Sequence, residues 1–362
     1  MIATAPGKLI LTGEYAVLDG GPALVIAVDR RVIAKRRKGP RGSSAFLLAI
    51  AETIGKRLGA DDPATKAAME IFVDSSPLYD GTTKLGLGSS AAVTVAATAL
   101  ALAADHEAVP LIDRQQVLAI ASEAHAMAQA ARAAETTVGV RRSGADIAAG
   151  VGVRGSGADI AAAVYGGVIA FQRAAPEQLA WPSDAAAHGR AIALATGTAD
   201  TLAWPSGVTL IPFFTGISAD TAALIAAVAE ARASRRVAVD AALTAVVRAS
   251  RAACQACAAH VPEIASSALI AALAFAANAM DQLAIATDLP LVPDCVTAAR
   301  SALKPLGGTA KTTGAGGGDV AIAVIPATED VNEAKRLVTE AGGQIIELVV
   351  DQTGVDLQPD AQ

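Results

Sequence analysis

Cysteine is scarce in this chain, and the few cysteines form no regular pattern. Only three occur among 362 residues, at Cys254, Cys257 and Cys295. An odd and sparse set argues against a disulfide framework and favours a reducing compartment such as the cytoplasm. Cys254 and Cys257 have metal-ligand spacing, but no second pair accompanies them in this Ala-rich, helical stretch. We therefore expect neither a zinc site nor a redox site there.

An excess of positive charge is also missing. Lys and Arg number 29 against 35 Asp and Glu, which gives a formal net charge of −6 and argues against a broad nucleic-acid surface. The start of the chain lacks the basic and apolar regions of a secretory signal. Residues 85–104 and 264–280 carry no charge, but they are so rich in small residues that buried helices explain them better than membrane spans. We expect a cytoplasmic monomer or homodimer with no nucleic-acid or membrane partner.

Aromatic residues make up only 3% of the chain, although 53% of it is apolar, largely through alanine. This composition is typical of a helix-rich protein with a tightly packed interior, and the length favours two domains. Up to residue 214 short apolar strands accompany helices expected at 46–58, about 90–104 and about 113–135. Long Ala-rich helices and two further strands follow residue 220. The sequence predicts an α+β protein with an N-terminal domain at 1–195 and a C-terminal domain at 196–362.

The chain contains neither a G-x-x-x-x-G-K-[ST] phosphate loop nor the signatures of protein kinases, so nucleotide binding would require another design. Three other segments are candidates for chemistry. The first runs from Ala5-Pro6-Gly7-Lys8 into residues 13–15. A lysine beside a Pro-Gly turn is held at a fixed point, where its ammonium attracts a phosphate or lowers the pKa of a hydroxyl. On its own, Lys8 would be interpreted as a surface residue.

The second segment is the glycine turn within residues 84–92. Its glycines let backbone N–H groups converge on an anion, the following helix presents its positive end, and the serine hydroxyls can reach a phosphate or Mg²⁺. A plain helix N-cap is the simpler alternative. The string also fits the dinucleotide fingerprint G-x-G-x-x-A, with Asp105 near the expected distance. However, residues 80–84 form a polar turn where that fingerprint needs a buried strand.

The third segment, residues 311–319, has four glycines among the five positions 314–318. Such a run is costly in folding entropy and indicates either a backbone that closely approaches another group or a flexible turn. An internal repeat adds a complication, because residues 138–150 recur at 151–163 with two differences. Two short copies are too few for a solenoid and indicate a tandem duplication.

Taken together, the three segments resemble the three motifs of the GHMP kinases, the superfamily of galactokinase, homoserine kinase, mevalonate kinase and phosphomevalonate kinase. Within this superfamily the chain is similar to the bacterial and fungal phosphomevalonate kinases. The features that carry this similarity are residues 13–17, Lys84, residues 157–167, residues 215–221 and Asp319.

The resemblance implies a ribosomal-protein-S5 domain 2-like N-terminal domain, a ferredoxin-like C-terminal domain and an active site between them. It implies that Asp159 orients or deprotonates the acceptor and that Lys8 stabilises charge, while Ser90 helps to hold Mg²⁺. Asp146 is the equivalent residue of the first repeat copy, but only Asp159 is followed directly by Tyr-Gly-Gly and a strand, so we favour Asp159. The ATP-binding residues implied are Lys84, Gly86, Leu87, Gly88, Ser89, Ser90, Ala91, Gly314, Ala315, Gly316, Gly317 and Gly318, and the substrate-binding ones are Lys311, Ser218, Thr221 and Tyr15.

The resemblance also implies ATP-dependent conversion of 5-phosphomevalonate to 5-diphosphomevalonate, with Mg²⁺, in the mevalonate pathway. The attacking phosphate oxygen would already be ionised, so neutralising charge matters more than a strong base. The alternatives are a mevalonate kinase or another GHMP small-molecule kinase, a family member that binds these ligands without catalysis, and a dinucleotide-binding oxidoreductase.

Overall fold

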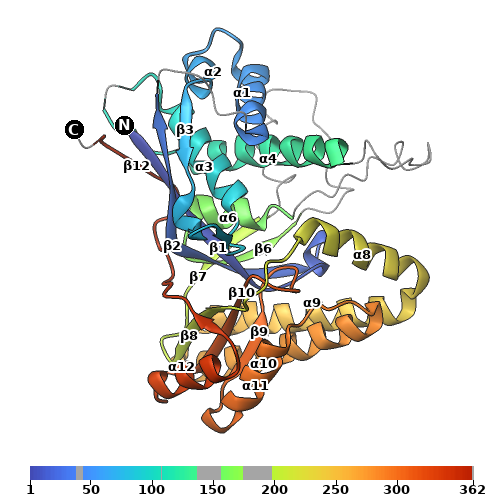
Figure 1. Ribbon diagram of the computed structural model, residues 1–362. Helices are drawn as coiled ribbons and strands as arrows, with labels where there is room; N and C mark the ends of the chain where they lie inside the picture. The colour runs from blue at the N-terminus through green and yellow to red at the C-terminus, as the bar shows by residue number, and fades with distance from the viewer. Residues whose placement is uncertain (38–43, 107, 137–155, 174–197, 361–362) are drawn as a thin grey trace.

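The computed structural model describes residues 1–37, 44–106, 108–136, 156–173 and 198–360. These residues form a six-stranded sheet, a four-stranded sheet and the helices that pack on them (Figure 1). Every strand pairing within the described ranges is antiparallel. The combination of long helices with antiparallel sheets confirms the predicted α+β class.

The six-stranded sheet has the order β12-β1-β2-β6-β7, with β3 paired to β2. Its two long strands, β1 and β2, pair along the whole of β1 from Ile2 to Thr12. Their register shifts between Pro6 and Gly7, directly before Lys8. Such irregularities bend a strand and change the direction of its side chains. The strands of this sheet are β1 (Ile2–Thr12), β2 (Pro22–Arg36), β3 (Ile71–Asp74), β6 (Val168–Gln172), β7 (Thr198–Leu202) and β12 (Asp356–Gln358).

Helices α3 and α6 pack directly on β1 and β2, and α1, α2 and α4 pack on α3. Ten of the fourteen residues of α3 are buried, because its alanines and threonines are small enough for close contact on all sides. The charge-free run that begins at residue 85 is thus a core helix, as the sequence predicted. These helices are α1 (Ala45–Leu58), α2 (Pro63–Ala68), α3 (Ser89–Leu102), α4 (Arg114–Thr136) and α6 (Ala158–Tyr165).

The four-stranded sheet has the order β11-β8-β10-β9. Its central strand β10 is buried on both faces: Ala321, Ala323 and Ile325 pack with α11 and α12, whereas Ile322 and Val324 join the larger core. A strand buried on both sides needs a continuous apolar run, which the sequence supplies. The elements of this half are β8 (Val208–Phe214), α8 (Thr221–Ser234), α9 (Arg236–Ala258), α10 (Pro262–Thr287), α11 (Asp294–Leu303), β9 (Thr309–Thr312), β10 (Val320–Pro326), α12 (Val331–Glu340) and β11 (Gln344–Ile345).

Two strands from the later part of the chain belong to the six-stranded sheet. β7 follows residue 197 yet belongs to the six-stranded sheet, and β12, near the C-terminus, pairs with β1 at the N-terminus. Helix α9 contacts β1, β2 and β7, so it also joins the two halves. The domain division between residues 195 and 196 stays a prediction.

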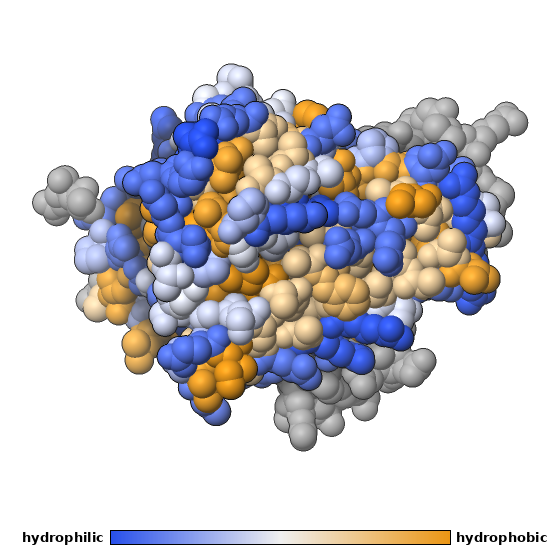
Figure 2. Space-filling view, turned by 90° about the horizontal axis from the view of Figure 1, so that it is seen from below, coloured by the Kyte–Doolittle hydropathy of each residue, from blue (hydrophilic) through white to orange (hydrophobic). Residues whose placement is uncertain are grey.

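Helix α10 is long and apolar enough to cross a membrane by length and composition alone. It packs along α9 and against β9, and Leu269, Leu273, Met280 and Leu283 are fully buried. A mostly buried core helix passes the same test, and 44% of the 18-residue apolar window of α10 is buried. Viewed from the side of the C-terminal helices, the surface has a band of apolar residues between hydrophilic ones (Figure 2).

Candidate active site

The glycine turn at 86–90 lies between the hairpin of β4 (Tyr79–Asp80) with β5 (Thr83–Lys84) and the start of α3. Leu85 and Leu87 anchor it, since each is only 1% exposed. Gly86 and Gly88 have φ values of 75° and 74°, which residues other than glycine rarely adopt. Gly88 is the N-cap of α3, so the first N–H groups of the helix lack intrahelical acceptors and carry the positive end of its dipole. This geometry suits an anion.

The strand before the turn is inconsistent with a dinucleotide-binding unit. β5 has only two residues and pairs antiparallel with β4 in an isolated hairpin. The dinucleotide fingerprint requires a buried parallel strand that leads into the glycine turn. The local structure therefore agrees with the polar turn at residues 80–84 that precedes the glycine turn in the sequence.

Lys8 lies directly beside the glycine turn. Its backbone N–H donates to the Leu87 carbonyl at 2.9 Å, and its Nζ donates to the Gly86 carbonyl at 3.1 Å. A Cβ atom at Gly88 would lie 2.8 Å from Lys8 Cε, so glycine is also needed here for the close approach of the lysine. Lys8 is thus fixed at the glycine turn, although Pro6 and Gly7 form no turn of their own and lie within β1.

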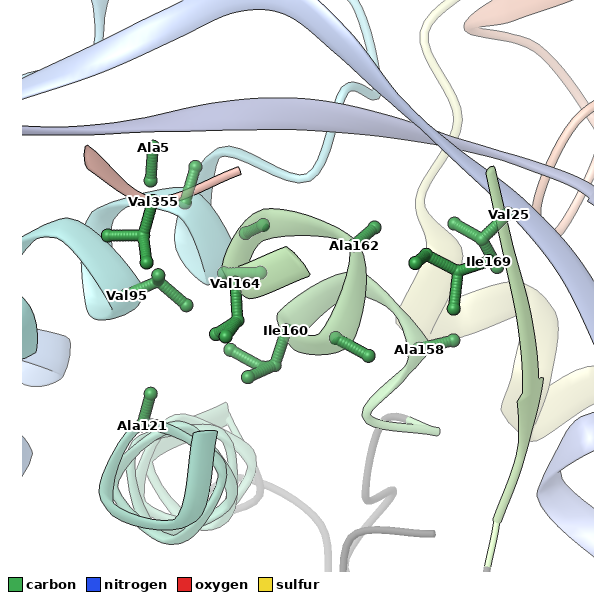
Figure 3. Packing of buried hydrophobic residues seen from close by; sticks show 14 of the residues in the cluster. Ala5, Val25, Val95, Ala121, Ala158, Ile160, Ala162, Val164, Ile169 and Val355 are labelled. Atoms are coloured by element: carbon green, nitrogen blue, oxygen red, sulfur yellow. The ribbon is translucent and has the colours of Figure 1, made fainter. Parts of the chain in front are cut away.

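Asp159 lies in the first turn of α6, behind Gly157, whose φ is 88°. Its Oδ1 accepts the Ile160 N–H at 3.0 Å. The apolar side chains of α6, including the fully buried Ile160 and Val164, point towards α3, α4 and the sheet (Figure 3). This packing fixes the helix while Asp159 itself stays partly exposed. Asp146 lies outside the described residues.

Asp319 reaches the turn from the C-terminal half. A Cβ atom at Gly86 would lie 2.5 Å from Asp319 Oδ2, so the carboxylate packs against the bare glycine backbone. Asp319 has φ 57° and is held by the 217–219 backbone: its N–H donates to the Ile217 carbonyl at 2.7 Å, and its Oδ1 accepts the Ala219 N–H at 3.2 Å. The sequence marked this residue only as a point of family resemblance.

Four charged side chains therefore interact around the turn. Burial lowers the pKa of Lys8, whereas Asp159 and Asp319 act in the opposite direction and Lys84 lowers it further. Burial raises the pKa of Asp319, and the hydrogen bond from Ala219 with the two lysines opposes that rise. A group of two ammonium ions and two carboxylates beside a helix N-terminus suits chemistry on phosphates.

Ser90 hydrogen-bonds to a residue to which the sequence gave no role. His125 of α4 places its Nε2 3.1 Å from Ser90 Oγ. Burial lowers the pKa of His125, and Asp159 partly opposes this. No local signal around His125 pointed to this contact, because its partner lies 35 positions earlier in the chain.

The second glycine segment, 314–318, is largely packed against the protein itself. A Cβ atom at Gly316 would lie 2.3 Å from the Leu291 carbonyl, and one at Gly317 would lie 2.8 Å from a methyl carbon of Leu224. The Gly317 N–H donates to the Leu291 carbonyl at 2.7 Å. A Cβ atom at Gly314, in contrast, would have no described neighbour within 4 Å. Close approach within the protein thus explains Gly316 and Gly317, whereas Gly314 faces open space.

Tyr15 and Lys311 connect this segment to the end of β1. The Tyr15 hydroxyl donates to the Ala315 carbonyl at 2.6 Å, and burial raises its pKa. Lys311 is 1% exposed and forms an ion pair with the fully buried Glu14, while also donating to the Thr312 carbonyl. Its ammonium is therefore engaged inside the protein rather than directed at the glycine turn.

Ser218, Thr221 and Lys84 are exposed. Ser218 lies within the 217–219 backbone that holds Asp319, and Thr221 begins α8 directly after its N-cap, Asp220. The structure thus brings Lys8, Lys84 and Asp159 into electrostatic reach of one another around the first glycine turn, with Ser218 in the backbone that holds Asp319.

No protein-family model matches the chain. Phosphomevalonate kinase from Streptomyces sp. (strain CL190) is 32% identical over 139 residues, which cover 27% of this chain and 37% of that protein. Mevalonate kinase from Methanothermobacter thermautotrophicus is 36% identical over 105 residues, which cover 26% of this chain and 33% of that protein. The matched stretches span about a third of the length of these curated relatives.

Solved structures match almost the whole chain. The Lin0012 protein from Listeria innocua superposes with a TM-score of 0.75 at 22% identity and covers 99% of each chain. Phosphomevalonate kinase from Streptococcus pneumoniae, solved with phosphomevalonate and AMPPNP, superposes with a TM-score of 0.72 at 17% identity and covers 97% of this chain and 99% of that one. The chain therefore has the GHMP kinase fold, and in sequence it resembles phosphomevalonate and mevalonate kinases.

Proposed function

We propose that the protein transfers the terminal phosphoryl group of ATP to the phosphate of 5-phosphomevalonate, giving 5-diphosphomevalonate and ADP. The observation that carries this proposal is the Lys8 ammonium held at the glycine turn that begins α3, with the Asp159 carboxylate close enough to interact with its charge. A helix N-terminus with an adjacent lysine attracts a polyphosphate, and a carboxylate beside them suits an acceptor group. The sequence similarity to a phosphomevalonate kinase supports this choice of substrate.

In this proposal, positioning and charge neutralisation do most of the catalytic work. The free N–H groups at the start of α3 bind phosphate oxygens of ATP, and the Lys8 ammonium offsets charge on the transferred group. The acceptor is a phosphate oxygen that is already ionised at neutral pH, so Asp159 acts mainly by orienting it. This follows because phosphoryl transfer requires reactants held in line more than it requires a strong base.

Mg²⁺ fits these residues as a partner of the nucleotide. Among the described residues, no group of three His, Cys, Asp or Glu side chains could hold a metal ion on its own. Mg²⁺ commonly binds through substrate phosphates, water and one or two protein oxygens. The oxygens beside the turn include the Ser90 hydroxyl and the carboxylates of Asp159 and Asp319, and a bound ion would supply further charge neutralisation.

We also propose that Lys84, Ser218 and Thr221 bind the substrate's own phosphate, because all three are exposed and carry phosphate-binding groups. Lys311 is omitted from this set because Glu14 engages its ammonium. Segment 314–318 would face the reacting phosphates through Gly314, the glycine with open space around it. A cytoplasmic location and a monomeric or homodimeric state remain predictions.

The second candidate is a mevalonate kinase, which the similarity to the Methanothermobacter enzyme favours. Mevalonate offers a hydroxyl, whose proton must be removed during transfer, so Asp159 would then act as a base. A phosphate acceptor carries no such proton, so Asp159 would then only orient it.

The deciding experiment measures ADP release with phosphomevalonate, mevalonate, homoserine and galactose offered separately. The proposal expects turnover with phosphomevalonate. Turnover with mevalonate alone would transfer the assignment to the second candidate, and tight ATP binding without turnover would favour a ligand-binding member of the superfamily. Enhanced nicotinamide fluorescence on mixing with NADH would instead favour an oxidoreductase.

A further inference from the structure

The Ser90 hydroxyl is held by a side chain from a different helix. His125 Nε2 lies 3.1 Å from Ser90 Oγ, across the contact between α3 and α4. A serine hydroxyl rotates freely unless a partner fixes it. In the first turn of α3, this bond therefore determines where the hydroxyl oxygen directs its lone pairs.

His125 is itself rigidly placed. Its side chain is buried, with the residue only 4% exposed, and its ring stacks on Phe46 of α1 with centroids 5.2 Å apart and an angle of 28° between the planes. The Arg132 guanidinium carbon lies 5.9 Å from the centre of the same Phe46 ring. Three helices thus contribute to the position of one imidazole nitrogen. Such support is what a precise site needs, since a loosely held group loses its alignment.

In its hydrogen bond with His125 Nε2, the Ser90 hydroxyl either donates or accepts. If the hydroxyl donates to His125, both oxygen lone pairs remain free for a cation, whereas a hydroxyl that accepts keeps its hydrogen for a phosphate oxygen. An imidazole whose other nitrogen carries the proton offers one acceptor nitrogen, and Nε2 is the nitrogen that lies 3.1 Å from Ser90 Oγ. The first arrangement is consistent with a Ser90 oxygen that faces a divalent ion.

We propose that His125 is a positioning residue that accepts the Ser90 hydroxyl hydrogen and so directs the Ser90 oxygen towards the divalent cation carried by the nucleotide. This inference rests on the proposed function at the glycine turn. His125 touches neither nucleotide nor substrate in this scheme. Its effect passes entirely through Ser90.

The test is a double-mutant cycle with His125→Leu, Ser90→Ala and both changes together. Loss of one buried hydrogen bond should lower kcat about tenfold in His125→Leu. The same change made in the Ser90→Ala background should have no further effect, because the group through which it acts is already gone. Equal losses in the two backgrounds would indicate that His125 only supports packing, which would overturn the proposal.

A second readout is nucleotide affinity with and without metal. Binding of a fluorescent ATP analogue should be unchanged in His125→Leu when EDTA is present, whereas the tightening caused by added Mg²⁺ or Mn²⁺ should be largely lost. His125→Gln can accept the same hydrogen bond, so it should recover most of that tightening, and thermal melting of both variants checks folding. Equal weakening with and without metal, or no recovery in His125→Gln, would overturn the proposal.

These outcomes distinguish the proposed kinase function from the proposed role of His125. A parent protein that binds no nucleotide would refute both the proposed function and this inference. A parent that turns over but shows an additive cycle would refute the role of His125 alone.

Discussion

The buried ion pair between Glu14 and Lys311 is where one substitution should destabilise the protein strongly. The two residues lie 297 positions apart and join the end of β1 to β9. The Glu14 side chain is completely buried, the Lys311 side chain is 1% exposed, and Glu14 Oε2 has no partner among the described residues. Removal of one partner leaves a dry, uncompensated charge. Lys311→Met should therefore lower the free energy of unfolding by about 3–5 kcal/mol.

The loss of stability in Lys311→Met should be smaller at low pH than at high pH. Burial raises the pKa of Glu14, and Lys311 opposes that rise, so the pKa rises further in Lys311→Met. A carboxyl whose folded pKa exceeds its unfolded value of about 4.3 favours folding when protonated, and this contribution disappears as pH rises through the folded pKa. Lys311→Met should therefore be less destabilised at about pH 5 than at about pH 8.

Urea unfolding followed by circular dichroism measures both effects. Lys56→Met is the matched control, because it removes a lysine from an exposed pair with Glu52, and such pairs add little stability. The double variant Glu14→Leu with Lys311→Met should lie within about 2 kcal/mol of the parent, since an apolar pair replaces the ionic one. An unchanged midpoint in Lys311→Met, or an equal loss at both pH values, would refute the reasoning.

Three further predictions concern the glycine turn, the acceptor site and the cysteines. Gly86→Ala should weaken ATP binding more than Gly81→Ala. Both glycines have a positive φ, but only at Gly86 would the new Cβ collide with a neighbour, the Asp319 carboxylate. Equal binding constants for the two variants would contradict this. Asp159→Asn should lower kcat by up to about 100-fold, because an acceptor without its charged orienting group is misplaced for in-line transfer. The same change in the first repeat copy should not lower kcat, and an Asp159→Asn rate equal to the parent's would remove the assignment. Burial raises the pKa of Cys254 to about 11 and of Cys257 to about 12, so native protein should react slowly with iodoacetamide at neutral pH and faster as pH rises, and rapid neutral-pH labelling would contradict that burial.

Local patterns in the sequence predicted the parts of the site that local geometry determines. The glycine turn at 86–90 and the charge-free run after it form a helix N-terminus and a core helix, because glycine spacing and small side chains act within a few residues. These features need no knowledge of distant partners. Lys8 was singled out for the Pro-Gly before it, but Pro6 and Gly7 lie within β1 and its partner Gly86 lies 78 positions away.

The remaining contacts depend on partners far apart in the chain. The family resemblance implied that Lys311 binds the substrate, yet its ammonium pairs with Glu14, which follows a strand of the other sheet. His125 lies in an Ala-rich helix with no motif around it, and its role depends on which helix packs opposite. Hydrophobic pattern and turn chemistry do not specify such pairings, because they report burial and local conformation rather than the identity of the neighbour.

Asp319 shows how the two halves combine into one site. A residue with a side chain at φ 57° is less stable than glycine there, and the chain already has glycine at the three preceding positions. The aspartate side chain must therefore contribute something that glycine lacks. It accepts the Ala219 N–H and lies against Gly86, close enough to Lys8 and Lys84 to interact with their charges. The carboxylate thus connects the C-terminal half to the glycine turn, so a site formed by the N-terminal half alone would lack one of its charged groups.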